Sequence, residues 1–199
     1  CSYEGYEDID GDADASTYEW FISGVSVGTA DTLSGVFVGG DSITCTVTPD
    51  DGTDTGSSLS AAITIENTAP VLADVTLSPD PAYEADTLVC SPGTTTDVDG
   101  STSFTYTYTW TVNGSDPGET SSQLTGDDFD RDDTVHCTVT PSDDDAGDPV
   151  DSNTVTIENT APSIDSVSIT PEPAYAASTL TCSYEGYEDI DGDADASTY

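Results

Sequence analysis

The sequence predicts an all-β protein built from tandem antiparallel β-sandwiches arranged end to end. Three observations support this prediction. Aspartate outnumbers glutamate about three to one among 40 acidic residues, and aspartate favours turns over helices. Several stretches alternate apolar and polar residues with a period of two, which is typical of half-buried strands. Clusters of Pro, Gly and Asp separate these stretches at short intervals, as in small sandwich domains.

The charge of the chain limits its partners. Arg131 is the only Lys or Arg, and the formal net charge is −39. Such a charge repels nucleic-acid phosphates and anionic lipid surfaces, so neither is an expected partner. No apolar run is long enough to insert into a membrane. High charge with modest hydrophobicity can also indicate disorder, but the regular strand patterning argues against it.

Short strings recur along the chain at one displacement. IENTAP stands at 65–70 and 157–162, and CTVTP at 45–49 and 137–141, each displaced by 92 residues. The chain also opens and closes on CSYEGYEDIDGDADASTY, at 1–18 and 182–199. We interpret the sequence as slightly more than one period of a longer chain, in which two diverged domains of about ninety residues alternate.

Three domains follow from this interpretation. Residues 1–70 form a domain that lacks its first strand, residues 71–162 form a complete domain, and residues 163–199 begin a third, which copies the first. The alternative is a subunit whose C-terminal segment completes the N-terminal domain of a neighbour by strand donation.

The clearest strand patterns direct cysteines and tryptophans inward. FTYTYTWTV, at 104–112, places Trp110 among aromatic residues on one face and four threonines on the other. TVHCTVT and DTLVC direct Cys137 and Cys90 to the apolar face in the same way. The 1–70 domain repeats the pattern around Trp20 and Cys45. Each predicted sandwich therefore holds a tryptophan between two inward cysteines.

This arrangement resembles the immunoglobulin-like (Ig-like) fold, in which a strand-B Cys, a strand-C Trp and a strand-F Cys meet. The matching residues are Cys1, Trp20 and Cys45, and Cys90, Trp110 and Cys137. Ile43 and Val135 stand where antibody domains carry a tyrosine two residues before the second Cys. The chain therefore looks more like the tandem Ig-like, PKD-like and cadherin-like repeats of large prokaryotic surface or extracellular fibre proteins.

The resemblance implies one disulfide per domain. The implied pairs are Cys1–Cys45 and Cys90–Cys137, and Cys182 is left over because its partner would lie beyond the chain. The alternative is that the cysteines are reduced and simply buried. Paired cysteines imply an extracellular or cell-surface location, because disulfides persist in oxidising compartments.

The resemblance also places the B–C and F–G loops of each domain beside the linker that enters it. These segments are rich in carboxylates, which repel one another unless a cation lies among them. Calcium suits such a site, because it accepts about six to eight oxygens with loose geometry. The predicted calcium ligands are Glu66, Asn67, Asp97, Asp99, Asp143, Asp144, Glu158, Asn159, Asp189, Asp191, Asp8 and Asp10. The alternatives are solvated Asp-rich turns or the acidic surface of a halophile.

No enzyme is predicted. The lone histidine, His136, points outward by strand parity and lies beside no Ser or Cys nucleophile. No phosphate-binding glycine loop or zinc motif is present. Asn113-Gly-Ser is the one candidate glycosylation site.

These observations favour a structural segment of a long extracellular fibre or adhesin stalk, with calcium stiffening the domain joints. Its partners would be neighbouring copies of the same repeat, in the same chain or as a homopolymer. One alternative is a self-assembling filament subunit joined by strand exchange. Another is a module that binds a glycan or protein, for which Tyr3 and Tyr6 are the only candidate loop aromatics.

Overall fold

The computed structural model describes residues 1–198, which divide into two compact units. Unit 1 holds residues 1–70 with the loops 96–104 and 142–146, and unit 2 holds the rest. Tyr199, the end of the predicted third domain, lies outside the described residues. The described residues contain strands and turns but no helix, and thus no helix that could cross a membrane.

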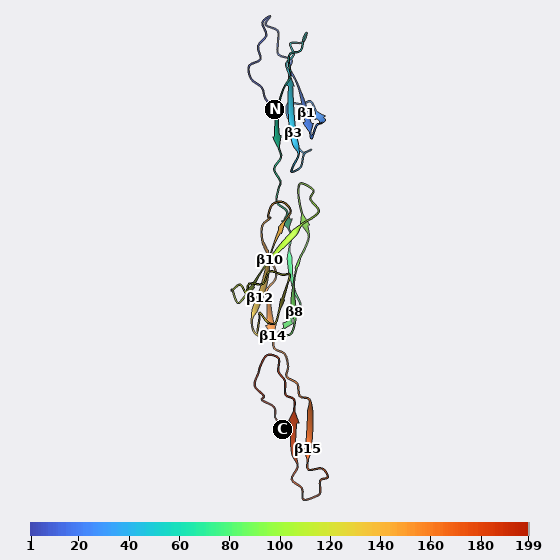
Figure 1. Ribbon diagram of the computed structural model, residues 1–199, viewed down its shortest axis with the longest axis vertical. Helices are drawn as coiled ribbons and strands as arrows, with labels where there is room; N and C mark the ends of the chain where they lie inside the picture. Colours follow the sequence, from blue (N-terminus) through green and yellow to red (C-terminus); the bar gives the residue numbers. More distant parts are fainter. Residues whose placement is uncertain (199) are drawn as a thin grey trace. The chain divides into compact units, whose positions relative to one another are not determined.

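Unit 1 contains one antiparallel sheet in the order β2-β1-β3-β4 (Figure 1). Its strands are β1 (Thr17–Ile22), β2 (Val25–Gly28), β3 (Ser42–Thr48) and β4 (Leu59–Thr64). Ser23 and Gly24 link β1 to β2 with φ angles of 48° and 85°. Positive φ at both central residues matches the twist of a two-residue hairpin, and glycine adopts it without steric cost.

The apolar face of this sheet is centred on β3, where Ile43, Cys45 and Val47 are buried. Cys45 forms the predicted disulfide with Cys1, and its register partner on β1 is Trp20. The irregular segment 1–16 lies on the sheet through this disulfide and through a 2.8 Å hydrogen bond from the Ala15 amide to the Asp50 carbonyl. Residues 1–70 therefore hold one sheet with a partial cover.

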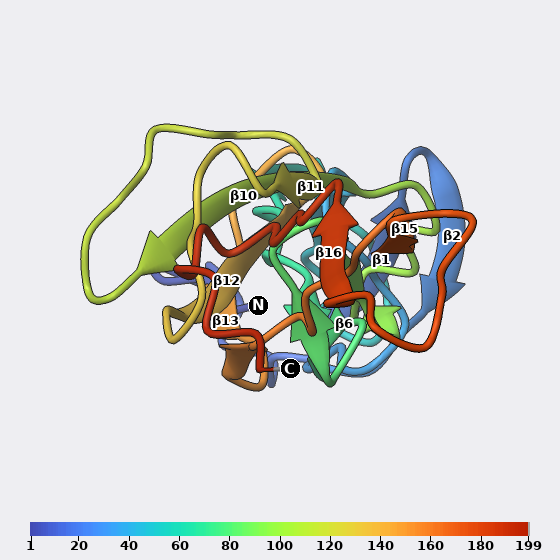
Figure 2. The ribbon, with the colours of Figure 1, turned by 90° about the horizontal axis from the view of Figure 1, so that it is seen from below.

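Unit 2 contains a two-layered β-sandwich (Figures 1 and 2). One sheet runs β10-β12-β14-β7, with β13 paired to β12, and the facing sheet runs β11-β8-β6. Two short strands form a further pair, β5–β9. The bounds are β5 (Val71–Leu72), β6 (Val75–Ser78), β7 (Ala82–Tyr83), β8 (Thr87–Pro92), β9 (Thr95–Thr96), β10 (Thr105–Val112), β11 (Gln123–Thr125), β12 (Thr134–Ser142), β13 (Val150–Asp151) and β14 (Val155–Glu158).

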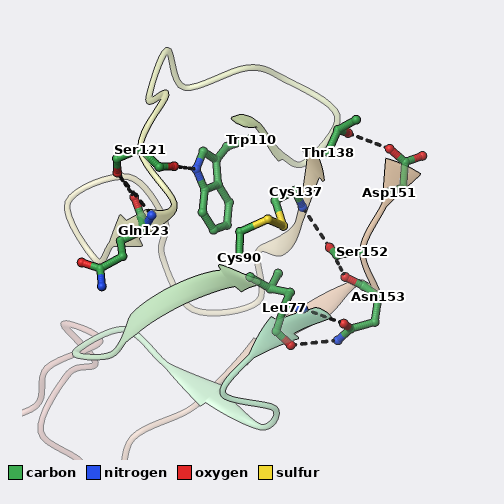
Figure 3. The surroundings of a disulfide bond; sticks show 10 residues. All are labelled: Leu77, Cys90, Trp110, Ser121, Gln123, Cys137, Thr138, Asp151, Ser152 and Asn153. Carbon is green, nitrogen blue, oxygen red and sulfur yellow. Dashed lines mark hydrogen bonds between the residues drawn. A yellow bond between two sulfur atoms is a disulfide. The ribbon is translucent and has the colours of Figure 1, made fainter. Parts of the chain in front are cut away.

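A disulfide and a tryptophan occupy the centre of the sandwich (Figure 3). Cys90 of β8 is bonded to Cys137 of β12, so the bridge joins the two sheets as predicted. Trp110 of β10 is 0 % exposed, and its indole nitrogen donates to the Ser121 carbonyl at 2.9 Å. Ser121 lies on the segment between β10 and β11, which swings wide of the strands before it returns (Figure 2). The predicted all-β, Ig-like sandwich with one disulfide is confirmed here.

The C-terminal part of unit 2 is a two-stranded antiparallel pair. It comprises β15 (Ser166–Thr170) and β16 (Thr181–Glu185), and of their residues only Tyr184 is partly buried. Cys182 of β16 is exposed and unpaired among the described residues. This pair therefore presents apolar side chains to solvent, including Val167 and Ile169.

Candidate cation sites at the two linkers

The first linker, residues 65–70, contacts two loops that belong to the same unit. Its Thr68 amide donates to Asp99 Oδ2 at 2.6 Å, and the Gly39 amide donates to Asp99 Oδ1 at 2.7 Å. The Asn67 side chain donates to Asp143 at 3.1 Å and to Asp145 at 3.2 Å. We call this group the first cluster; its members are Asn67, Thr68, Asp97, Asp99, Asp143 and Asp145.

Backbone amides favour the charged form of two carboxylates in the first cluster, Asp99 and Asp143. The amides of Thr68 and then Gly39 lower the pKa of Asp99, and the nearby Asp143 charge opposes them weakly. The Asp145 amide is the largest influence on Asp143 and lowers its pKa too. Hydrogen bonds to a carboxylate favour its ionised form. Asp99 and Asp143 are therefore carboxylates whose ionised form is stabilised by neutral amide donors.

Two oxygens of the first cluster are buried without a hydrogen-bond partner. They are Oδ2 of Asp97 and Oδ2 of Asp143. The other oxygen of each side chain accepts a backbone amide: Asp97 Oδ1 from Asp99 at 2.7 Å, and Asp143 Oδ1 from Asp145 at 3.1 Å. A buried, unsatisfied carboxylate oxygen costs free energy, because it has lost water and gained no donor. A cation that contacted both oxygens would remove this cost.

The second linker, residues 157–162, repeats the arrangement. The Thr160 amide donates to Asp191 Oδ2 at 2.5 Å, and both residues stand 92 positions after Thr68 and Asp99. Oδ2 of Asp189 is again buried without a partner, as is Oδ1 of Asp191. We call this group the second cluster; its members are Asn159, Thr160, Asp189, Asp191, Asp193 and Arg131. The motif of a threonine amide beside an unsatisfied aspartate therefore occurs twice.

Sequence reasoning missed two charged residues at the second linker, Arg131 in the second cluster and Glu84 beside it. Arg131 Nη1 donates to Asn159 Oδ1 at 2.8 Å and forms an ion pair with Asp193. Glu84 lies near Asp191, and its pKa is raised by burial first and then by the charges of Asp130 and Asp191. Arg131 could have been found from the sequence, because it is the only Lys or Arg in a chain of net charge −39. Glu84 gave no such signal, because only folding brings it to the cluster.

The structure distributes the twelve predicted ligands unevenly. It gathers Asn67, Asp97, Asp99 and Asp143 in one cluster, and Asn159, Asp189 and Asp191 in the other. Glu66, Asp144 and Glu158 are exposed on the same segments, and Asp8 and Asp10 lie in the N-terminal segment. Within residues 1–198, no three or more acidic, His or Cys side chains form a metal-binding group. Any cation would therefore also need amide, carbonyl or water oxygens.

The glycosylation candidate Asn113 has a structural role in the hairpin after β10. It adopts a φ of 50°, and its side chain donates to Asp133 at 2.5 Å. Its Oδ1 also accepts the Thr134 amide at 3.1 Å. Both ends of the side-chain amide therefore hold the turn against the start of β12. Whether Asn113 carries a glycan stays a prediction.

The loop aromatics of residues 1–70 line a shallow hollow. Tyr3, Tyr6, Val47, Pro49 and Leu59 contribute to it. The Tyr3 ring packs against Tyr18 with 6.0 Å between ring centroids, and its hydroxyl donates to Asp14 at 2.5 Å. These contacts hold the Tyr3 ring beside Tyr18 of β1.

No protein-family model matches the chain, and no curated protein matches it. Among solved structures it is similar to the fibronectin(III)-like modules of Clostridium thermocellum CbhA. The identity is 14 % and the TM-score is 0.30, over 71 % of this chain and 77 % of that chain. The Ig-like assignment rests on the strand order, the disulfides and the buried Trp110.

Proposed function

We propose that the chain is a structural segment of an extracellular fibre or adhesin stalk in which calcium holds each linker against the loops that it contacts. The observation that carries the proposal is the motif found at both linkers. Aspartates bind the Thr68 and Thr160 amides while nearby carboxylate oxygens are buried without a donor. Oδ2 is buried without a donor in Asp97 and in its equivalent 92 residues later, Asp189. This shared feature points to a shared ligand, and calcium prefers oxygen ligands.

The residues present fit calcium better than a smaller or softer ion. Asp97 and Asp143 would offer their free oxygens in the first cluster, as would Asp189 and Asp191 in the second. Carbonyl groups and water would complete a loose shell, which calcium tolerates and magnesium does not. When bound, the ion would neutralise carboxylates that otherwise repel one another. The linker would then resist bending, because Thr68 or Thr160 is fixed through its aspartate.

Three further features support an extracellular structural role. Both disulfides are of the kind that persists in oxidising compartments. The charge of −39 would keep neighbouring fibres soluble and apart. The resemblance to tandem prokaryotic surface repeats agrees with modules that contact only their neighbours. The partners are neighbouring copies of the repeat, in one chain or in a homopolymer, and the proposal assigns no catalytic activity.

The first test is a thermal melt of the protein in millimolar calcium and in chelator at equal ionic strength. Calcium is expected to raise the melting temperature, because it binds only the folded arrangement. Asp97→Asn/Asp99→Asn should remove most of that rise. The control Asp127→Asn/Asp148→Asn removes the same charge from two exposed positions outside the clusters and should keep it. The absence of any calcium-dependent shift in the unmodified protein, at low and at high salt, would contradict the proposal.

A second candidate function, assembly by strand exchange, is favoured by complementary exposed strands. Val167 and Ile169 on β15 are 62 % and 60 % exposed, and Ile63 on β4 is 64 % exposed. Their equivalents 92 residues away, Val75, Leu77 and Val155, are buried in the sandwich. β15 of one copy would thus cover residues 1–70 of another. Strand exchange predicts filaments whose length grows with protein concentration, and the variant Val167→Asp/Ile169→Asp should not form them. Monomers at every concentration of the unmodified protein would rule out strand exchange.

A further inference from the structure

The second linker faces a positive side chain that the first linker lacks. Arg131 stands 92 residues after Gly39, and the two occupy the same place in equivalent turns. The next residue of each turn donates its amide to the carbonyl of the first residue of its linker, Gly40 to Ile65 at 2.8 Å and Asp132 to Ile157 at 2.9 Å. The two positions are therefore equivalent in the fold as well as in the sequence.

The two residues at this position act in different ways. In the first cluster the Gly39 amide binds Asp99. A Cβ atom at Gly39 would lie 2.8 Å from Asp99 Oδ2, so the position cannot carry a side chain as it stands. In the second cluster the Arg131 side chain extends to Asn159 of the linker and to Asp193 of the loop. The first linker thus has a backbone contact from Gly39 to Asp99, where the second has a charged side chain that joins Asn159 to Asp193.

The partner of Arg131 is also specific to the second cluster. Asp193 stands 92 residues after Ser101. The two linkers therefore differ by a pair of residues: Gly39 and Ser101 lie beside the first cluster, where Arg131 and Asp193 belong to the second. The positive and the negative side chain gained in the second cluster contact each other.

We propose that the Arg131 side chain bridges the second linker to the loop that it contacts, through a hydrogen bond to Asn159 and an ion pair with Asp193. This bridge needs no divalent ion. The guanidinium stays charged at all relevant pH values and offers several donors in a fixed plane, which suits two acceptors on different segments. The side chains of Arg131 and Asp193 are partly exposed, so the contribution is modest and weakens with salt. The bridge does not depend on the proposed function, because calcium held by Asp189 and Asp191 would act beside it rather than in its place.

The test follows the amide hydrogen exchange of Thr160 and Thr68 by NMR, in chelator at low salt. Arg131→Gln is expected to speed the exchange of Thr160 about 1.5- to 5-fold, the range for partly exposed ion pairs, and to leave Thr68 unchanged. Asp193→Asn should have the same effect, and the double variant should add little to either single change. Arg131→Lys should retain part of the protection, and molar NaCl should abolish the difference between variants.

Two outcomes would overturn the proposal: unchanged Thr160 exchange in Arg131→Gln, or fully additive effects of the two single changes. Calcium added to the unmodified protein separates this result from the proposed function. If calcium leaves Thr68 exchange unchanged, the calcium proposal fails. The Arg131 bridge is then still decided by Thr160 exchange in Arg131→Gln and Asp193→Asn. If calcium slows Thr68 exchange but Arg131→Gln leaves Thr160 unaffected, the bridge is wrong and the calcium site remains.

Discussion

Residues 1–70 and 71–162 share one pattern of Cys, Trp and Cys but bury it to different extents. Trp110 is fully buried between two sheets, whereas Trp20 is partly exposed on a single sheet. Both indole nitrogens nevertheless donate to a backbone carbonyl at 2.9 Å. Ile63 is 64 % exposed, while Val155, its equivalent 92 residues later, is 1 % exposed. The indole hydrogen bond therefore forms wherever the Cys, Trp and Cys pattern occurs. Full burial of the tryptophan also requires a second sheet, which residues 71–162 have.

The two copies of the identical eighteen-residue stretch show the same dependence. Residues 182–185 lie in β16, which pairs with β15, whereas residues 1–4 form no strand. The contact from Tyr3 to Asp14 nevertheless recurs from Tyr184 to Asp195. Identical residues therefore make the same short-range contacts in both places. Strand structure appears only where a partner strand is available, because pairing and packing decide it more than local preference.

The largest expected effect comes from truncating each tryptophan in turn. Trp110→Ala should cost about 3–5 kcal/mol, the range for a large aromatic side chain removed from a packed core. Trp20→Ala should cost clearly less, since part of its surface already faces water. Urea unfolding followed by circular dichroism measures both losses, and the remaining tryptophan's fluorescence shows whether the damage is confined to one region. Equal losses would contradict the difference in packing.

The two disulfides should differ in how fast they are reduced. They close loops of similar sequence separation, 44 and 47 residues, so chain entropy predicts nearly equal stabilisation of about 2–4 kcal/mol. Access differs, because Cys1 is exposed whereas Cys90 and Cys137 are buried. Dithiothreitol must reach a sulfur atom, so Cys1–Cys45 should be reduced first under native conditions. Reduction of Cys90–Cys137 should require unfolding of the core around it.

Alkylation of the released thiols followed by mass spectrometry measures the two reduction rates. A moderate concentration of urea sharpens the comparison: it should accelerate the reduction of Cys90–Cys137 far more than that of Cys1–Cys45. Indistinguishable rates in the absence of urea would show that residues 1–16 protect Cys1 as well as the sandwich protects Cys90.

Much of the fold could be predicted from the sequence because its signals are local and repeated. The period-two pattern around Trp110 predicted the strand and its buried face, and the resemblance to the Ig-like fold implied the Cys90–Cys137 disulfide, which is confirmed. The shared displacement of 92 residues showed which loops are equivalent. That equivalence is visible in the matching bonds of Thr68 and Thr160.

The parts that sequence reasoning missed depend on contacts between distant segments. Glu84 reaches the second cluster because β7 pairs in parallel with β14, next to the linker. Arg131 and Asp193 are 62 residues apart and meet only through folding. The partial exposure of Trp20 is likewise a property of the missing second sheet rather than of its own strand. No local pattern encodes any of these contacts.

The smallest expected effects concern the pH dependence of stability at two carboxylates, Glu84 beside the second cluster and Asp99 in the first. Burial and the charges of Asp130 and Asp191 raise the pKa of Glu84 in the folded state. Its ionisation therefore opposes folding as the pH rises through that raised value, and Glu84→Gln should stabilise the protein at neutral pH. The gain should vanish below about pH 4.3, the unfolded pKa, where Glu84 is neutral in both states. Exposed Glu172→Gln, which changes the net charge equally, is the control.

Asp99 should give the opposite sign when measured in chelator. Amide donors from Thr68 and then Gly39 lower its pKa, so its contribution to stability is present above the unfolded pKa and is lost as the pH falls through the folded one. Asp99→Asn should thus destabilise the protein at neutral pH and converge with the unmodified protein in acid. Urea midpoints across pH 3–7 test both variants. If both instead stabilised the protein at neutral pH, relief of the overall charge of −39 would outweigh the local donors, and the clusters would not be the organised sites described above.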